Sequence, residues 1–146
     1  MQLNFDSDDH QKTPNVDWAD REKWVNGDRV LFEVMSADLL EVMKDGESRL
    51  KIRFLYKVGS GENAGLHTTK EVWDPLKNKK TQKYLKFLLG ECMGVPQEKL
   101  KGGNVPLCLA ESVGSQHTAV CELTNGGKWV NWNDPQSHGG KPVYRG

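Results

Sequence analysis

Residues 49–58 have the sequence RLKIRFLYKV, in which apolar and basic side chains alternate. A β-strand projects successive side chains to opposite faces, so this alternation predicts a strand with one apolar face for a core and one basic face. The apolar parity contains Leu50, Ile52, Phe54, Tyr56 and Val58. The basic parity has no acid, is interrupted only by Leu55, and contains Arg49, Lys51, Arg53 and Lys57.

This basic face has two interpretations. An antiparallel sheet commonly exposes one polar face to water, so the four bases are ordinary surface residues in the first interpretation. In the second, the strand faces phosphates, because four charges of one sign share the face. The sequence that follows carries five further lysines before and along a helical pattern, at positions 77, 79, 80, 83 and 86.

Length and charge limit the class of protein. A chain of 146 residues fits one domain with little room for a second. Its 20 basic and 20 acidic residues exclude a globally basic nucleic-acid coat. The charge is uneven, because residues 1–26 hold six acids and three bases, which leaves 14 acids and 17 bases in residues 27–146. No run of about 18 apolar residues and no apolar signal-peptide core is present, so we expect a soluble cytoplasmic protein without membrane contact.

Metal, disulfide and catalytic signatures are weak. Three cysteines lack a CxxC spacing, so we expect reduced thiols and no disulfide framework. His117 and Cys121 could join Cys92 and Cys108 around zinc, but structural zinc sites usually show paired ligands about two to four residues apart. A triad of His67, Asp74 and Ser60 can be arranged on paper, yet nothing places a nucleophile on a strained turn. We therefore expect no metal, no cofactor and no enzyme activity.

The order of elements predicts an all-β fold with one helix. Strand patterns cover residues 28–43, 49–58, 66–74, 104–113, 117–124 and 128–132, and a helical pattern covers residues 76–94. A helix between the third and fourth strands is what a five-stranded OB-fold (Greek-key) barrel requires, although an α+β sandwich fits the same elements. We expect an acidic N-terminal arm with a short turn at 1–26, the folded domain at 27–132 and a flexible tail at 133–146.

Between Gly27 and Val120 the chain resembles a phage and prophage family of OB-fold single-stranded DNA-binding proteins, long catalogued as a domain of unknown function. The resemblance rests on Gly27 before the first strand, the strand LKIRFLYKV, the SGENAG element at 60–65, the helix end LLGECMGV at 88–95, and EKLKGGNVPLCL at 98–109. It implies single-strand binding in phage DNA replication or recombination inside a bacterial host cell. Many single-strand-binding proteins end in an acidic tail, whereas this chain ends with Lys141, Tyr144 and Arg145.

Non-sequence-specific binding of single-stranded DNA requires a positive groove for the backbone and aromatic rings for base stacking. The residues that suit these roles are Arg49, Lys51, Arg53, Lys57, Lys70, Trp73, Lys77, Lys79, Lys80 and Trp132. Trp129 and Trp132 lie three apart, so a strand sends them to opposite faces and one of them can fill the core. Phage or host replication and recombination proteins are the further expected partners. The alternative function is a phage protein-interaction module that inhibits or adapts a host enzyme, because tryptophans also anchor protein interfaces.

Overall fold

In the computed structural model, which describes residues 15–138, five strands form one antiparallel sheet in the order β3-β2-β1-β4-β5. The strands are β1 (Arg29–Lys44), β2 (Glu47–Val58), β3 (His67–Trp73), β4 (Gln116–Thr124) and β5 (Trp129–Ser137). The predicted β-rich class is confirmed. β3 and β5 are the two edges, and the sheet is not closed between them.

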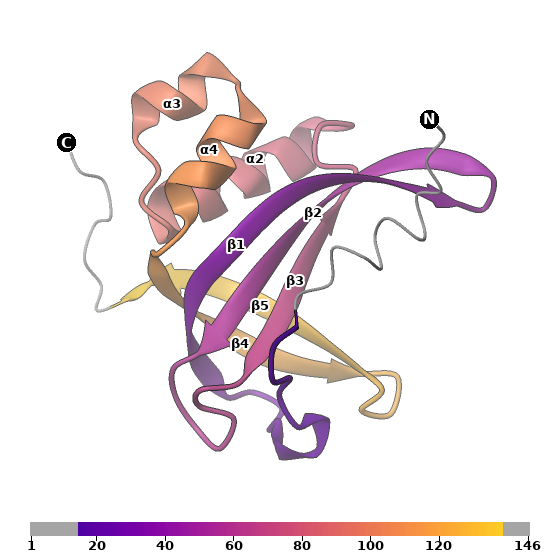
Figure 1. Cartoon of the computed structure of the whole chain (residues 1–146), viewed down its shortest axis with the longest axis vertical. Coiled ribbons are helices and arrows are strands. Elements are labelled where there is room, and N and C mark those ends of the chain that lie inside the picture. The colour runs from indigo at the N-terminus through magenta and orange to yellow at the C-terminus, as the bar shows by residue number, and fades with distance from the viewer. Residues whose placement is uncertain (1–14, 139–146) are drawn as a thin grey trace.

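The first strand joins the two halves of the sheet. Arg29–Glu33 pair with β4, while the stretch from Phe32 to Lys44 pairs with β2 and its register shifts between Val34 and Ser36. This irregularity is a β-bulge, which bends a strand and increases its twist. As a result β4 and β5 cross behind β1, β2 and β3 in Figure 1.

Apart from a short 3-10 helix before β1, the helices lie between β3 and β4 in the chain and gather at one end of the sheet (Figure 1). They are α2 (Lys79–Phe87), which continues as the π-helix η2 (Leu88–Cys92), then α3 (Gln97–Gly102) and α4 (Val105–Ser112). The prediction of a single helix is wrong, since residues 105–112 form a helix where a strand was expected. The Asn104 side chain accepts a hydrogen bond from Leu107 N, and a proline lies in the first turn, which together favour a helix start.

The core confirms the predicted apolar parity of β2. Ile52, Phe54 and Tyr56 are fully buried, and Val58 is nearly so. All four belong to the hydrophobic core, in which Phe32 stacks on Tyr56 with ring centroids 4.7 Å apart. Cross-strand register places Lys70 opposite Phe54 on this inner side, whereas Glu71 lies opposite Arg53 on the outer side.

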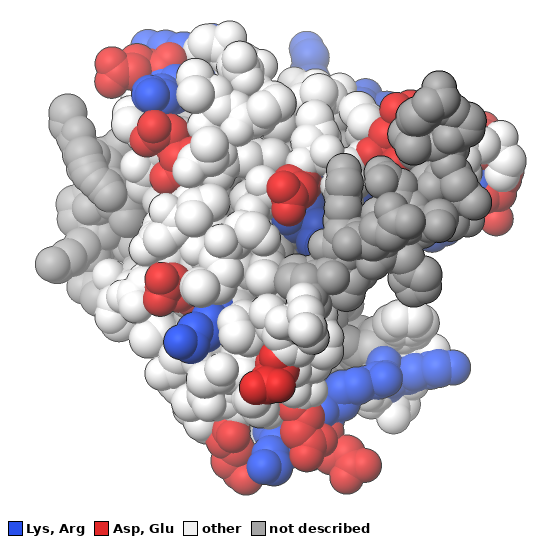
Figure 2. All heavy atoms as spheres, viewed as in Figure 1, with Lys and Arg blue, Asp and Glu red and all other residues white. Residues whose placement is uncertain are grey.

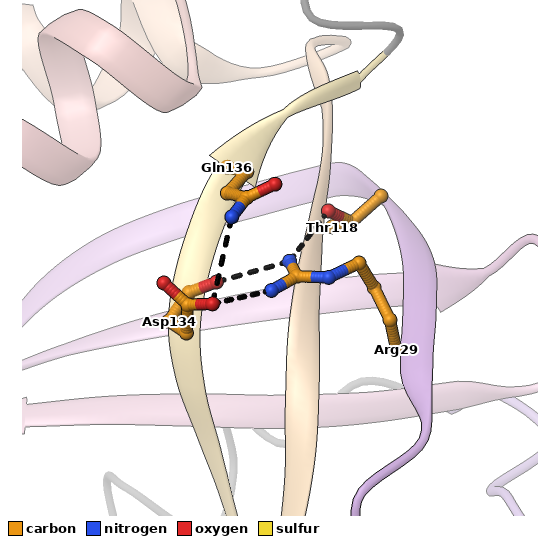
Figure 3. Close-up of polar contacts among 4 residues, drawn as sticks. All are labelled: Arg29, Thr118, Asp134 and Gln136. Atoms are coloured by element: carbon orange, nitrogen blue, oxygen red, sulfur yellow. Dashed lines mark hydrogen bonds and ion pairs between the residues drawn. The ribbon is translucent and has the colours of Figure 1, made fainter.

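The end of β5 is held by Arg29, the first residue of β1. Its guanidinium donates to Thr118 Oγ1 of β4 at 2.9 Å, and to Asp134 O at 3.0 Å and Asp134 Oδ2 at 2.5 Å on β5 (Figure 3). Gln136 Nε2 also donates to Asp134 Oδ2, at 3.5 Å. β5 therefore continues through residues 133–137, which the sequence assigned to a flexible tail. The remaining tail positions, 139–146, and residues 1–14 of the acidic arm lie outside the described residues.

Within residues 15–138, no helix is long and apolar enough to cross a membrane. In the same residues, no group of three or more His, Cys, Asp or Glu side chains is placed to hold a metal ion. Cys92, Cys108 and Cys121 are buried free thiols. The cysteines therefore serve as small core residues, as free cysteine often does.

Candidate nucleic-acid interface

A groove of about 770 Å³ opens between the edge strands β3 and β5. Its walls also include the segment before β1 and the turn between β4 and β5. All five tryptophans of the chain line it: Trp18, Trp24, Trp73, Trp129 and Trp132. The gap in the sheet is thus the place where the aromatic side chains suited to base stacking gather.

The tryptophans divide into a buried floor and accessible rims. Trp132 is 2% exposed and packs edge-on against Trp24, with ring centroids 4.8 Å apart. Trp18 is 44% exposed and Trp129 is 60% exposed. The prediction that Trp132 offers a stacking surface is therefore wrong, because its ring is enclosed in the core; Trp129, on the opposite face of β5, has the accessible ring.

The segment before β1 forms one rim because it pairs with β3. His67 N donates to Asp17 O at 2.9 Å, and Ala19 N donates to His67 O at 2.8 Å. The short 3-10 helix η1 (Arg21–Lys23) follows, with the Asp20 side chain capping it by accepting from Glu22 N. Arg21 Nη2 then donates to Lys128 O at 2.5 Å in the β4–β5 turn, so this rim is tied across to the opposite wall.

Within the described part of the chain, three cations and one carboxylate line the groove: Arg21, Lys70, Lys128 and Glu71. Arg21 and Lys128 are exposed. Lys70 is half-buried, donates to Trp132 O at 2.9 Å, and lies 5.4 Å from the centroid of the Tyr84 ring. Burial lowers the pKa of Lys70 to about 8, because desolvation disfavours the ammonium form. The groove is thus mildly positive rather than strongly basic.

The basic parity of β2 faces the outer side of the sheet, where acids from β3 and the residue after it meet it. Glu71 Oε2 accepts from Lys51 Nζ at 3.0 Å and from Arg53 Nε at 3.4 Å. Arg49 pairs with Asp74, and the hydrogen bond between them raises the pKa of Arg49 and lowers that of Asp74. The predicted acid-free basic face is a property of β2 alone, because Glu71 of β3 and Asp74 after it supply the opposing charges.

Trp73 lies at the boundary between this outer side and the groove. Three cationic groups lie near its ring centroid: Lys44 Nζ at 4.8 Å, Arg49 Cζ at 4.8 Å and Lys51 Nζ at 5.0 Å. Cation–π attraction of this kind holds the ring in place and occupies part of its surface. Trp73 is therefore a less open stacking surface than Trp129 or Trp18.

The structure brings together only part of the predicted site. Lys70, Trp73 and Trp132 line the groove, whereas Arg49, Lys51, Arg53, Lys57, Lys77, Lys79 and Lys80 do not. On the face shown in Figure 2, basic and acidic side chains lie interspersed rather than in one basic patch. The site predicted from the sequence lacks four residues of the groove: Trp18, Trp129, Arg21 and Lys128. The number of tryptophans was the available signal, since five in 146 residues gather in one groove.

Beneath the groove, three buried side chains carry polar atoms without a hydrogen-bond partner among the described residues: Tyr56 Oη, both ring nitrogens of His117, and Trp132 Nε1. The His117 and Tyr56 rings meet edge to face, with centroids 5.0 Å apart. Burial, and then the charge of Lys70, lower the pKa of His117 to about 4. Burial also raises the pKa of Tyr56 well above its usual value, so both side chains are neutral near pH 7.

The three residues considered from the sequence as a catalytic triad, Ser60, His67 and Asp74, have separate structural roles. Ser60 Oγ accepts from Leu31 N at 3.0 Å, Asp74 pairs with Arg49, and His67 pairs with the segment before β1.

Comparison of the chain with protein-family models, curated proteins and solved structures gives no match in any of the three. The groove and its side chains are therefore the basis for a functional proposal.

Proposed function

We propose that the chain binds single-stranded DNA without sequence preference, and that the strand lies in the groove between β3 and β5. The observation that carries this proposal is the pair of accessible rings, Trp18 and Trp129, on a groove that all five tryptophans line. Arg21, Lys70 and Lys128 line the same groove. Rings that stack on any base, with cations for the backbone, are the requirements for sequence-tolerant binding. Phage DNA replication or recombination is the setting that the sequence resemblance suggests.

We also propose that the open sheet is an OB-fold whose barrel is unclosed between β3 and β5. The strand order supports this, because closing the sheet between these edges would give a five-stranded barrel with the helices between the third and fourth strands. OB-folds are partly open barrels that bind oligonucleotides with the face of strands 2 and 3 and the loops between strands 1 and 2 and strands 4 and 5. The groove includes two of these elements, β3 and the β4–β5 turn, but no residue of β2 or of the β1–β2 turn lines it.

Titration with oligo-dT at low ionic strength tests the proposal. Because every tryptophan lines the groove, we expect intrinsic tryptophan fluorescence to fall as the strand binds, and the complex to weaken as salt is added. Absence of both quenching and a salt-sensitive complex would refute single-strand binding. Double-stranded DNA of the same length is the matched ligand, and we expect it to bind more weakly because its bases are already stacked.

Trp129→Ala locates the binding surface. The ring is 60% exposed, so its removal should change stability little. Loss of one stacked base costs about 1–3 kcal/mol, which is roughly a 5- to 150-fold increase in Kd. Anisotropy of a labelled oligo-dT measures the change independently of tryptophan emission. Phe87→Ala is the control, because Phe87 is 44% exposed on α2 and does not line the groove.

A further inference from the structure

Lys70 has an unusual position for a lysine of an edge strand. It lies opposite Phe54 on the inner side of the sheet, and its ammonium reaches Trp132 O on the other edge strand at 2.9 Å. β3 and β5 do not pair with each other. The Lys70 side chain therefore spans the opening of the sheet, inside the groove rather than on its exterior.

No carboxylate neutralises this ammonium among residues 15–138. Its hydrogen bond there is to a carbonyl oxygen, and its ring contact is with Tyr84. Glu71, the one acid that lines the groove among the described residues, accepts from Lys51 and Arg53 on the outer side. An ammonium has three N–H donors, so Lys70 retains donor capacity beyond its bond to Trp132 O.

We propose that Lys70 is the anion subsite of the groove and receives one backbone phosphate of the bound strand. This inference rests on the proposed function. Trp18 and Trp129 are the accessible rings of the groove, so the bases on either side of that phosphate have stacking surfaces on both rims. The group that Lys70 recognises is the anionic phosphodiester of the polymer. Inorganic phosphate and a mononucleotide offer similar anionic phosphate oxygens.

The dependence of affinity on salt measures this contact. Each phosphate contact in a single strand contributes about −0.7 to the slope of log K against log salt. We expect Lys70→Met to make the slope shallower by about 0.7 and Lys70→Arg to restore it. Lys101→Met is the matched control, because Lys101 is exposed on α3 and does not line the groove. Its slope should equal that of the wild type.

The pH dependence of affinity gives a second readout that a merely structural lysine would not change. Neutralisation of Lys70 above its pKa of about 8 should weaken binding. Between about pH 7 and about pH 9 we expect a loss of affinity of up to about tenfold in the wild type. The Lys70→Met and Lys70→Arg variants should lack this loss, since neither side chain titrates there. Neighbouring Tyr84 on α2 has a pKa of about 12, and His117 on β4 has a pKa of about 4, so neither accounts for it.

The outcomes separate the two proposals. If the wild type binds oligo-dT and Lys70→Met keeps both the slope and the pH profile of the wild type, Lys70 is not the phosphate subsite and the groove function stands. If the wild type does not bind oligo-dT, both proposals are wrong. Competition by inorganic phosphate and by thymidine monophosphate distinguishes a site for the polymer from a site for a free phosphate. If Lys70 binds a phosphate of the polymer, neither compound should displace oligo-dT at the concentrations at which oligo-dT itself saturates the protein. Effective competition by either compound would overturn the assignment to a backbone phosphate.

Discussion

The salt dependence of binding decides between the groove and the outer basic surface. The groove offers three cations, Arg21, Lys70 and Lys128. At about 0.7 for each phosphate contact, three contacts give a slope of log K against log salt of about −2. The site predicted from the sequence has eight cations and would give a slope of about −6. The eight cations of that predicted site are Arg49, Lys51, Arg53, Lys57, Lys70, Lys77, Lys79 and Lys80.

The assay is anisotropy of a labelled oligo-dT at a series of KCl concentrations and constant pH. We expect the shallow slope, together with measurable affinity at high salt, because base stacking on the tryptophans depends little on salt. A slope near −6 would refute the groove as the main binding surface and would favour the outer side of β2 with the start of α2. Charge reversal of Lys79 and Lys80 is the corresponding control, and we expect it to leave the slope nearly unchanged.

Three further predictions concern the fold. Tyr56→Phe should leave the free energy of unfolding unchanged or raise it by up to about 1 kcal/mol, because it removes a buried hydroxyl that has no partner among the described residues; a clear loss in urea unfolding would contradict this. Arg29→Ala should lower the free energy of unfolding by about 1 kcal/mol, as expected for exposed polar contacts, and should speed amide hydrogen exchange at residues 133–137. Unchanged exchange at these residues would show that Arg29 does not hold the end of β5 in place. The pKa of His117 falls from 6.5 to about 4 on folding, so the unfolded chain binds more protons than the folded chain between these two pH values. The free energy of unfolding should therefore fall as the pH is lowered from 6.5 to about 4, by about 3 kcal/mol in all. The His117→Leu variant should lose less stability over the same pH range, and an identical loss would refute the assignment.

The parity of β2 was predictable because one residue pattern fixes both faces of a strand. Ile52, Phe54 and Tyr56 are buried as the alternation requires. The pattern gives no register between strands, however. Lys70 was grouped with Lys51 and Arg53, although pairing with Phe54 places it on the opposite side of the sheet. The same missing information concealed Glu71, which lies opposite Arg53 and offsets the charge of the outer side.

Two other differences have local physical causes. The segment VPLCLAES was predicted as a strand because Val105, Leu107 and Leu109 alternate along it. It follows a capping asparagine, Asn104, and has a proline in its first turn, and both favour a helix. Trp129 and Trp132 were correctly predicted to face opposite ways, yet parity alone does not say which face is buried. The choice is made by Trp24 and Phe32, which enclose the Trp132 ring from distant parts of the chain.

One residue of β3, Lys70, opposes closure of the sheet between β3 and β5. The inner side chains of β3 are Thr68, Lys70 and Val72, of which only Lys70 is charged. Pairing the two edge strands would enclose its ammonium, and burial of a cation without a carboxylate is costly. With the sheet open, Lys70 bonds the Trp132 carbonyl and remains half-buried beside the groove. The charge that makes Lys70 a candidate phosphate contact therefore also opposes closure of the site that would use it.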